Sequence, residues 1–243
     1  MCYHKASPQK ADLADYLQSL EMDVIIDDYD FYWHANGFNH PQMPVMTLGE
    51  PHRVQTFMWG MVPVFAKHRT DAKSWAGRML NATCEKAGST FKPYFQKQRC
   101  LVFVSGFFEW QWMDAKGKTK TPWFIHRENG RPFAMGGIYN HWTDRETGEV
   151  FSTYSVVTTP ANALMEQIHN TKKRMPLVLP EESWSEWLNP EKMPVELLVP
   201  APDEYLRAHQ VSKDLSRRGI DTNQAYIQEA VTVPGVAADR FLF

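Results

Sequence analysis

The chain has 243 residues, 43% of them hydrophobic, which is enough to bury one large core or two small ones. Its formal net charge of -2 argues against a globally basic nucleic-acid-binding protein, although a local basic groove is compatible with it. Its cysteines form no CxxC pair, and no apolar stretch is long enough for a signal peptide or a membrane-spanning helix. We therefore expect a cytoplasmic protein without membrane contact, folded as a single domain over residues 1–243.

The chain begins Met1-Cys2, and an initiator Met is normally removed when the next side chain is small. Removal leaves Cys2 with a thiol and a free α-amine on neighbouring carbons, groups that ordinarily titrate at about 8.5 and about 7.7–8.0. Such a 1,2-aminothiol condenses with an aldehyde to a Schiff base, and the thiol then closes a stable thiazolidine ring. A functionless cysteine on a frayed terminus is the more common case, so the rest of the chain has to decide between the two.

A helix is predicted to begin at Ser7-Pro8, where Ser can accept from the first free amides, and to extend to Leu20 with one apolar face. Residues 27–51 are loop-like and aromatic, and their histidines lack the spacing of a metal site, so no metal is expected. A strand is predicted over 54–60. The basic stretch 67–78 is interpreted as a solvated loop, with a phosphate-facing loop as the alternative.

The strand over 99–104 is predicted to be buried because it is a continuous apolar run, and it leads toward Glu109. Alternation along the strand places Glu109 on the same face as Phe107. Burying a carboxylate among apolar residues is costly unless it is paired. Glu109 is therefore either a solvent-exposed residue of an edge strand or a general acid/base in a desolvated cleft, and the sequence leaves both open.

Two strands over 122–126 and 132–139 flank Asn129-Gly130, which is typical of a hairpin. A β-branched strand over 151–158 precedes a helix that ends at His169, where the helix dipole favours the charged imidazole. Further predicted elements are a short helix through 91–95, a strand over 177–179, a helix over 181–188, a strand over 195–199 and a strand near the C-terminus. These elements indicate an α+β fold, with mostly antiparallel strands curling into a barrel-like core flanked by helices.

Several motifs share their order with a known family: Cys2, the Trp-Gly-x-x-Pro of 59–63, the Leu-Asn-Ala of 80–82 with Glu85, the Gly-Phe-Phe-Glu-Trp of 106–110, and His169 with the Arg-Met-Pro of 174–176. Together they resemble the SOS response-associated peptidase (SRAP) family, and they are spread over most of the chain. The resemblance implies an SRAP-like fold and a protein that binds single-stranded DNA. It also implies that the N-terminal Cys captures the ring-opened aldehyde of an abasic site as a thiazolidine DNA–protein crosslink.

The resemblance implies the catalytic residues as well. Cys2 is expected to be the nucleophile, and Asn81 to orient it or the sugar. Glu109 is expected to act as acid and base, and His169 to assist at the opened sugar. An abasic site is mostly a closed hemiacetal, and opening it needs one proton given to the ring oxygen and one removed from the hydroxyl, which suits a carboxyl–imidazole pair. No cofactor is expected, and the same groups could run the reaction backwards.

The expected grip on DNA departs from the family pattern. The family's usual Cys-Gly-Arg start is Cys2-Tyr3-His4 here, and its Asn-Ala-Arg ends in Thr83, so Lys5 and Arg78 are candidate replacements for the two arginines. The family's pair of Trp residues is replaced by Phe65-Ala66. Phosphate contacts and stacking rings supply affinity for a single strand. The expected DNA-binding residues are Lys5, Trp59, Phe65, Arg78 and Arg174.

Two other functions remain open. Cys2 with His169 as base would make a thiol peptidase, as the family name suggests. A non-catalytic module for single-stranded DNA would not need Cys2 at all. The favoured function, with abasic-site lyase and self-processing as associated activities, implies a monomer whose partner is single-stranded DNA with abasic sites. The protein would then be nucleoid-associated while it is bound.

Overall fold

The computed structural model describes residues 2–231. Its centre is a closed ring in which β10 pairs with β11 and β7, β7 with β4, β4 with β5, and β5 with β11. All neighbours are antiparallel except β5 and β11, where Trp59 lies opposite Tyr154 in a parallel pair. The ring strands are β4 (Gln42–Thr47), β5 (Glu50–Trp59), β7 (Arg99–Val104), β10 (Phe133–Thr143) and β11 (Val150–Pro160). This mixed barrel with flanking helices confirms the predicted α+β class.

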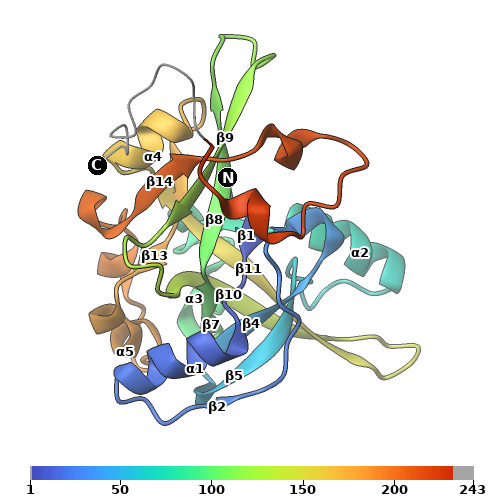
Figure 1. Ribbon diagram of the computed structural model, residues 1–243. Coiled ribbons are helices and arrows are strands. Elements are labelled where there is room, and N and C mark those ends of the chain that lie inside the picture. The colour runs from blue at the N-terminus through green and yellow to red at the C-terminus, as the bar shows by residue number, and fades with distance from the viewer. Residues whose placement is uncertain (1, 232–243) are drawn as a thin grey trace.

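A second sheet has the order β14-β9-β8-β1-β3, and all its neighbours are antiparallel. Its strands are β1 (His4–Ala6), β3 (Ala35–Asn36), β8 (Gly106–Trp112), β9 (Lys120–His126) and β14 (Arg207–Gln210). In Figure 1, β1 lies beside β8 near the N-terminus, and the long β8–β9 hairpin rises above them. Because β1 is an inner strand of this sheet, the start of the chain is held on both sides.

Every residue of β7 is buried because its two faces pack in different cores. Cys100 and Val102 lie inside the barrel with Phe107 of β8. Leu101 and Phe103 pack on the outside against the apolar face of the helix over residues 10–19. A strand covered on both faces has a continuous apolar sequence, and this explains the run over 99–104.

The remaining strands are β2 (Ile25–Ile26), β6 (Asn81–Thr83), β12 (Arg174–Pro176) and β13 (Val178–Leu179). The helices are α1 (Lys10–Ser19), α2 (Arg69–Arg78), α3 (Lys92–Lys97), α4 (Ala163–Ile168) and α5 (Trp184–Trp187). Short 3₁₀ helices occur over Gly37–Asn39, Cys84–Lys86, Glu181–Ser183, Val195–Leu197, Asp203–Tyr205, Lys213–Ser216 and Ala225–Gln228. None of the helices within residues 2–231 is long and apolar enough to cross a bilayer.

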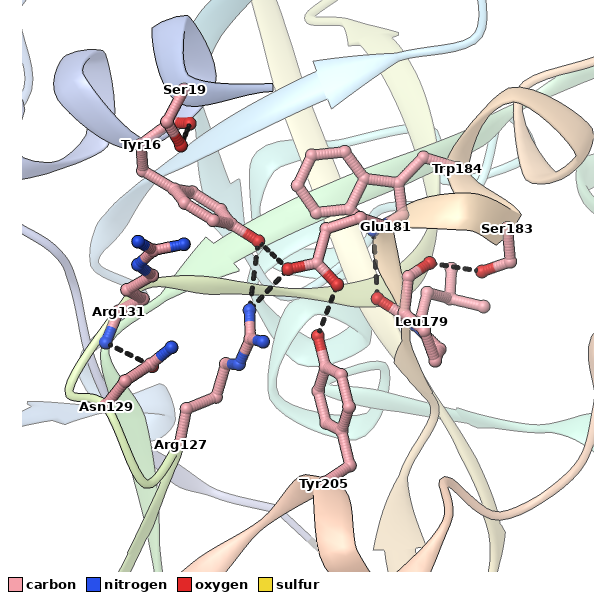
Figure 2. Close-up of polar contacts among 11 residues, drawn as sticks. Tyr16, Ser19, Arg127, Asn129, Arg131, Leu179, Glu181, Ser183, Trp184 and Tyr205 are labelled. Atoms are coloured by element: carbon pink, nitrogen blue, oxygen red, sulfur yellow. Dashed lines mark hydrogen bonds and ion pairs between the residues drawn. The ribbon is translucent and has the colours of Figure 1, made fainter.

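The Glu181 carboxylate joins four separate parts of the chain (Figure 2). Tyr16 of α1 and Arg127, which follows β9, both donate to its Oε1 atom. Tyr205 donates to its Oε2 atom at 3.1 Å. A half-buried carboxylate is stable here because its partners include a guanidinium and two hydroxyls. This cluster therefore fastens α1, the end of β9 and the segment before β14 to one another.

The predicted hairpin around Asn129-Gly130 is wrong. The turn itself forms, since Gly130 has a φ of 67° and its N–H donates to the Arg127 carbonyl oxygen at 3.0 Å. The flanking strands then part: β9 pairs with β8 and β14, whereas β10 pairs with β7, β11 and β13. A tight turn sets local chain direction, but burial of β10 between two ring strands decides its partners.

Four other local predictions also differ from the structure. Ser7 does not cap α1; its Oγ accepts from the backbone N–H of Tyr32 at 2.8 Å. Residues 27–51, predicted to be loop-like, contain β4, which pairs with β5 and with β7. Residues 67–78, interpreted as a solvated loop, contain α2, whose Ala72 and Ala76 are buried. The segment 195–199 holds a 3₁₀ helix instead of a strand. The predicted strand near the C-terminus lies outside the described residues.

Candidate active site

Cys2 lies immediately before β1 with 1% of its surface exposed, and it is a free thiol. Asn81, the first residue of β6, donates from Nδ2 to the Cys2 carbonyl oxygen at 2.9 Å. Pairing of β6 with β11 fixes Asn81 to the barrel wall. The hydrogen bond therefore ties Cys2 to the barrel. A frayed terminus, the alternative that the sequence left open, does not describe this residue.

Glu109 of β8 and His169, which directly follows α4, form a buried pair. The strand β8 lies beside β1, the strand that follows Cys2. Glu109 Oε2 and His169 Nδ1 are 3.9 Å apart, and only 12% and 7% of their side chains are exposed. His169 Nδ1 donates to the carbonyl oxygen of Arg174 at 2.8 Å, so a neutral ring carries its lone pair on Nε2. Glu109 is therefore not a solvent-exposed residue of an edge strand, since it is buried and β8 lies between β9 and β1. Its role as a general acid/base stays a prediction. Within residues 2–231, no group of three or more His, Cys, Asp or Glu side chains could hold a metal.

Burial dominates the electrostatics of the site. It raises the pKa of the Cys2 thiol to about 12; the charge of Lys5 counteracts this rise, and that of Glu109 adds to it. It also raises the pKa of Tyr3, with Glu109 and Cys2 adding to the shift. Burial lowers the pKa of His169 and outweighs the opposing charge of Glu109. The prediction that the helix dipole favours a charged His169 is therefore wrong, because desolvation of the imidazolium is the larger effect.

Two buried polar atoms of this region have no hydrogen-bond partner in the described part of the chain: Asn81 Oδ1 and Trp123 Nε1. Trp123 belongs to the same core cluster as Cys2 and lies directly opposite Glu109 in the β8–β9 pair. An unsatisfied buried polar group costs about 1–3 kcal/mol. These atoms offer one acceptor and one donor to a polar ligand. Trp123 was not predicted from the sequence, because only the strand register connects it with Glu109.

Lys5 and Trp59, both expected to contact DNA, are fully buried. Trp59 Nε1 donates to the Leu80 carbonyl oxygen at 2.9 Å. Lys5 Nζ donates to the Tyr154 hydroxyl at 2.7 Å and lies 3.7 Å from the centroid of the Trp59 ring. Both predictions of a DNA contact are wrong, because alternation along β1 and β5 turns these side chains into the barrel.

Phe65 and Arg78 lie on the surface with Trp75 between them. Phe65 is 60% exposed and packs edge-on against Trp75, with ring centroids 5.2 Å apart. The Arg78 guanidinium lies 5.8 Å from the Trp75 ring. The sequence analysis missed Trp75, although its position three residues before Arg78 puts both on one face of a helix. We call this surface the Phe65–Trp75–Arg78 patch. Arg78 precedes Asn81 by three residues in the sequence.

A second aromatic pair flanks Cys2. Tyr3 follows Cys2 and packs on Phe38, with ring centroids 5.1 Å apart and planes tilted by 34°. Phe38 is 55% exposed. Neither ring was among the predicted site residues, and adjacency of Tyr3 to Cys2 was the only sequence signal. The pair offers an apolar surface next to Cys2.

The Arg174 side chain is largely engaged within the protein. Its guanidinium forms a bidentate ion pair with Glu85, and Nη2 also donates to the Thr158 carbonyl oxygen at 2.7 Å. Its own carbonyl oxygen accepts from His169 Nδ1. Arg174 thus orients the imidazole, and a DNA contact by its side chain stays a prediction.

The sequence pattern of the family described as "SOS response associated peptidase (SRAP)" matches residues 1–218. The chain belongs to the SRAP family. The "Abasic site processing protein YoqW" of Bacillus subtilis (strain 168) is 32% identical over 209 residues, covering 82% of this chain and 87% of the relative. The "Abasic site processing protein YedK" of Escherichia coli is 36% identical over 115 residues, covering 46% of this chain and 48% of the relative. A crystal structure of a Bacteroides thetaiotaomicron protein superposes with a TM-score of 0.81 at 31% identity, covering 95% of this chain and 100% of that one.

Proposed function

We propose that the processed chain, beginning at Cys2, binds single-stranded DNA and captures abasic sites as a covalent thiazolidine crosslink. The observation that carries this proposal is the meeting of Cys2 with Asn81 and with the Glu109–His169 pair. The names of the SRAP relatives, as abasic site processing proteins, support the choice of substrate. In this proposal the protein is cytoplasmic, acts as a monomer and is nucleoid-associated while bound to DNA.

Opening of the abasic sugar is assigned to Glu109 and His169. The hemiacetal opens when its ring oxygen gains a proton and its C1 hydroxyl loses one. Because His169 donates Nδ1–H to a backbone carbonyl, its neutral ring accepts a proton at Nε2. The Glu109 carboxyl group gives a proton to the ring oxygen. The product is an aldehyde within reach of Cys2.

The Cys2 α-amine then attacks the aldehyde carbon, and water leaves as the Schiff base forms. The Glu109 carboxylate accepts the amine proton. Asn81 Oδ1, a buried acceptor without a partner among residues 2–231, is suited to an N–H of this amine or to a sugar hydroxyl. Addition of the Cys2 thiol to the imine carbon closes the ring. Elimination from the Schiff base gives abasic-site lyase activity, and the reverse sequence releases the crosslink.

The strand is proposed to run over the Phe65–Trp75–Arg78 patch toward Cys2. Stacking of a base on an aromatic side chain contributes about 1–3 kcal/mol and tolerates any sequence. Arg78 supplies a phosphate contact beside these rings. The Phe38 ring on Tyr3 supplies a second stacking surface at the nucleophile. This assignment replaces the buried Trp59 with rings that are exposed.

A thiol peptidase is the weaker candidate. A Cys–His peptidase needs its thiol directed at the imidazole, but Cys2 Sγ donates to the His4 carbonyl oxygen at 3.8 Å and His169 Nδ1 donates to the Arg174 carbonyl oxygen at 2.8 Å. A module that only binds DNA needs neither an anchored Cys2 nor a carboxyl–imidazole pair beside it. Self-processing enters the proposal as removal of Met1, which has to precede crosslinking because the residue blocks the α-amine.

The proposal is tested on a denaturing gel with protein whose measured mass shows Cys2 at the N-terminus. This protein is incubated with a single-stranded oligonucleotide that carries one abasic site. We expect a covalent band for the wild type and none for Cys2→Ala. For Glu109→Gln we expect the same band to form at a lower rate. Cys84→Ala is the matched control, since it removes a free thiol elsewhere and should crosslink like the wild type. Absence of the wild-type band refutes the proposal.

A further inference from the structure

Lys5 places an amine inside the barrel, directly downstream of the nucleophile. Its side chain is fully buried, and its Nζ has the Tyr154 hydroxyl at 2.7 Å and the Trp59 ring centroid at 3.7 Å. No carboxylate of residues 2–231 forms an ion pair with it. A buried ammonium without a counter-ion is costly, and an apolar side chain would fill the same space more cheaply. This cost points to a use for the amine.

The titratable groups that face Lys5 are two thiols and a phenol: Cys2, Cys100 of β7 and Tyr154 of β11. Burial lowers the pKa of Lys5 to about 7, while the charges of Cys2 and Cys100 act to raise it. Lys5 is in turn the largest charge that acts to lower the pKa of Cys2, and Glu109 opposes it from β8. Burial also raises the pKa of Cys100, and Lys5 counteracts that rise. The Lys5 ammonium and the Cys2 thiolate therefore stabilise each other.

We propose that Lys5 is the base for the Cys2 thiol: its amine, held by the Tyr154 hydroxyl and the Trp59 ring, accepts the proton that leaves the thiol while the thiazolidine ring closes. This role rests on the proposed function. Of the two thiols near Lys5, only Cys2 also carries the α-amine that forms the Schiff base. Lys5 Nζ contacts Trp59 and Tyr154, and both of these side chains share one core cluster with Cys2.

The proton on Sγ of Cys2 moves to Nζ of Lys5, and a sulfur lone pair forms the C–S bond to the imine carbon. The π electrons of the C=N bond pass to nitrogen, which takes a proton from the Glu109 carboxyl group. Lys5 then releases its proton to water, and the Glu109 carboxylate regains one from water. The net change is one C–S bond formed, one C=N π bond broken and one proton transferred from sulfur to nitrogen.

The test measures the pH dependence of Cys2 alkylation by iodoacetamide in the full Met1-free chain. Alkylation is quantified on the N-terminal peptide by mass spectrometry, so the other thiols do not interfere. Lys5→Met should raise the pH midpoint of Cys2 alkylation by about one unit, which corresponds to about tenfold less thiolate at pH 7. Lys10→Met, the same substitution at an exposed lysine of α1, should leave the midpoint unchanged.

Tyr154→Phe keeps the ring and removes the acceptor of the Lys5 hydrogen bond, so it should shift the midpoint in the same direction by less. It decides the question if Lys5→Met fails to fold. An unchanged midpoint in a folded Lys5→Met protein, or in Tyr154→Phe when that variant alone folds, overturns the role of Lys5. The proposed function fails separately, when the wild type forms no crosslink with an abasic oligonucleotide.

Discussion

Replacement of Asn81 by Ala should separate the activity of the protein from its stability. The substitution removes the hydrogen bond from Nδ2 to the Cys2 carbonyl oxygen, which is 2.9 Å long. It also removes Oδ1, a buried acceptor without a partner among residues 2–231. The first change releases Cys2 from the barrel wall. The second removes an unsatisfied buried acceptor that destabilises the folded state. We therefore expect Asn81→Ala to lose crosslinking activity while the fold keeps its stability.

The two effects have comparable size. A neutral hydrogen bond contributes about 0.5–1.5 kcal/mol net, and an unsatisfied buried acceptor costs about 1–3 kcal/mol. The buried Cys2 carbonyl oxygen also loses its donor, which costs about 1–3 kcal/mol, so the free energy of unfolding should change by no more than about 2 kcal/mol in either direction. The crosslinking rate depends only on the lost hydrogen bond to Cys2, so it should fall by about 2- to 13-fold. It should fall further if Oδ1 also binds the substrate. Asn81→Asp should cost more, because it sets a carboxylate oxygen against the Cys2 carbonyl.

The assay pairs single-turnover crosslinking of an abasic oligonucleotide with urea unfolding of the same protein. Asn140→Ala is the matched control: this buried residue donates from Nδ2 to the Val62 carbonyl oxygen at 2.7 Å and accepts at Oδ1 from Gln98 at 3.2 Å. It has no unsatisfied atom to remove, so it should lose stability. The reasoning is refuted if Asn81→Ala crosslinks at the wild-type rate, or if it is destabilised as much as Asn140→Ala.

Three further outcomes are expected. Burial, assisted by His34, lowers the pKa of His4 to about 3, and burial lowers that of His34 to about 4. The unfolded chain then binds more protons, so stability should fall as pH drops from about 6.5 to about 4, with a shallower slope in His34→Gln; equal unfolding midpoints in urea at pH 7 and pH 5 would contradict this. Phe65→Ala should weaken binding of single-stranded DNA by about 1–3 kcal/mol in a fluorescence anisotropy titration, whereas an unchanged Kd would exclude stacking there. Arg78→Met should reduce the slope of log affinity against log salt by about 0.7, and an unchanged slope would mean that this residue contacts no phosphate.

The parts of the fold that follow from local chemistry were accessible in the sequence. The apolar face of α1 and the continuous apolar run of β7 predict buried elements because each pattern matches the period of its backbone. The proposed nucleophile, Cys2, could also be predicted from the sequence, because the α-amine and thiol of a processed N-terminal Cys are covalent neighbours. Glu109 stood out because a carboxylate among aromatic residues needs an explanation.

The errors concern the direction in which a side chain points. The alternation of side chains predicts which neighbours share a strand face with Lys5 on β1 and with Trp59 on β5. It does not predict which face of each strand packs in the core. The Asn129-Gly130 turn forms as predicted, yet the strands on either side join different sheets. The link between Glu109 and Trp123 is likewise a matter of register.

The sequence alone specifies the groups that we propose react: an aminothiol, a carboxyl group, an imidazole and an amide. Only the folded chain brings Asn81 to the Cys2 carbonyl and turns the Lys5 amine inward. The physical reason is that the protonation state of a group depends on its desolvation. Which side chains come into contact depends on neighbours from other strands. Burial of His169 overrides the helix dipole that its local sequence predicts. Local sequence sets which chemistry is available, and tertiary packing decides which groups meet and in which charge state.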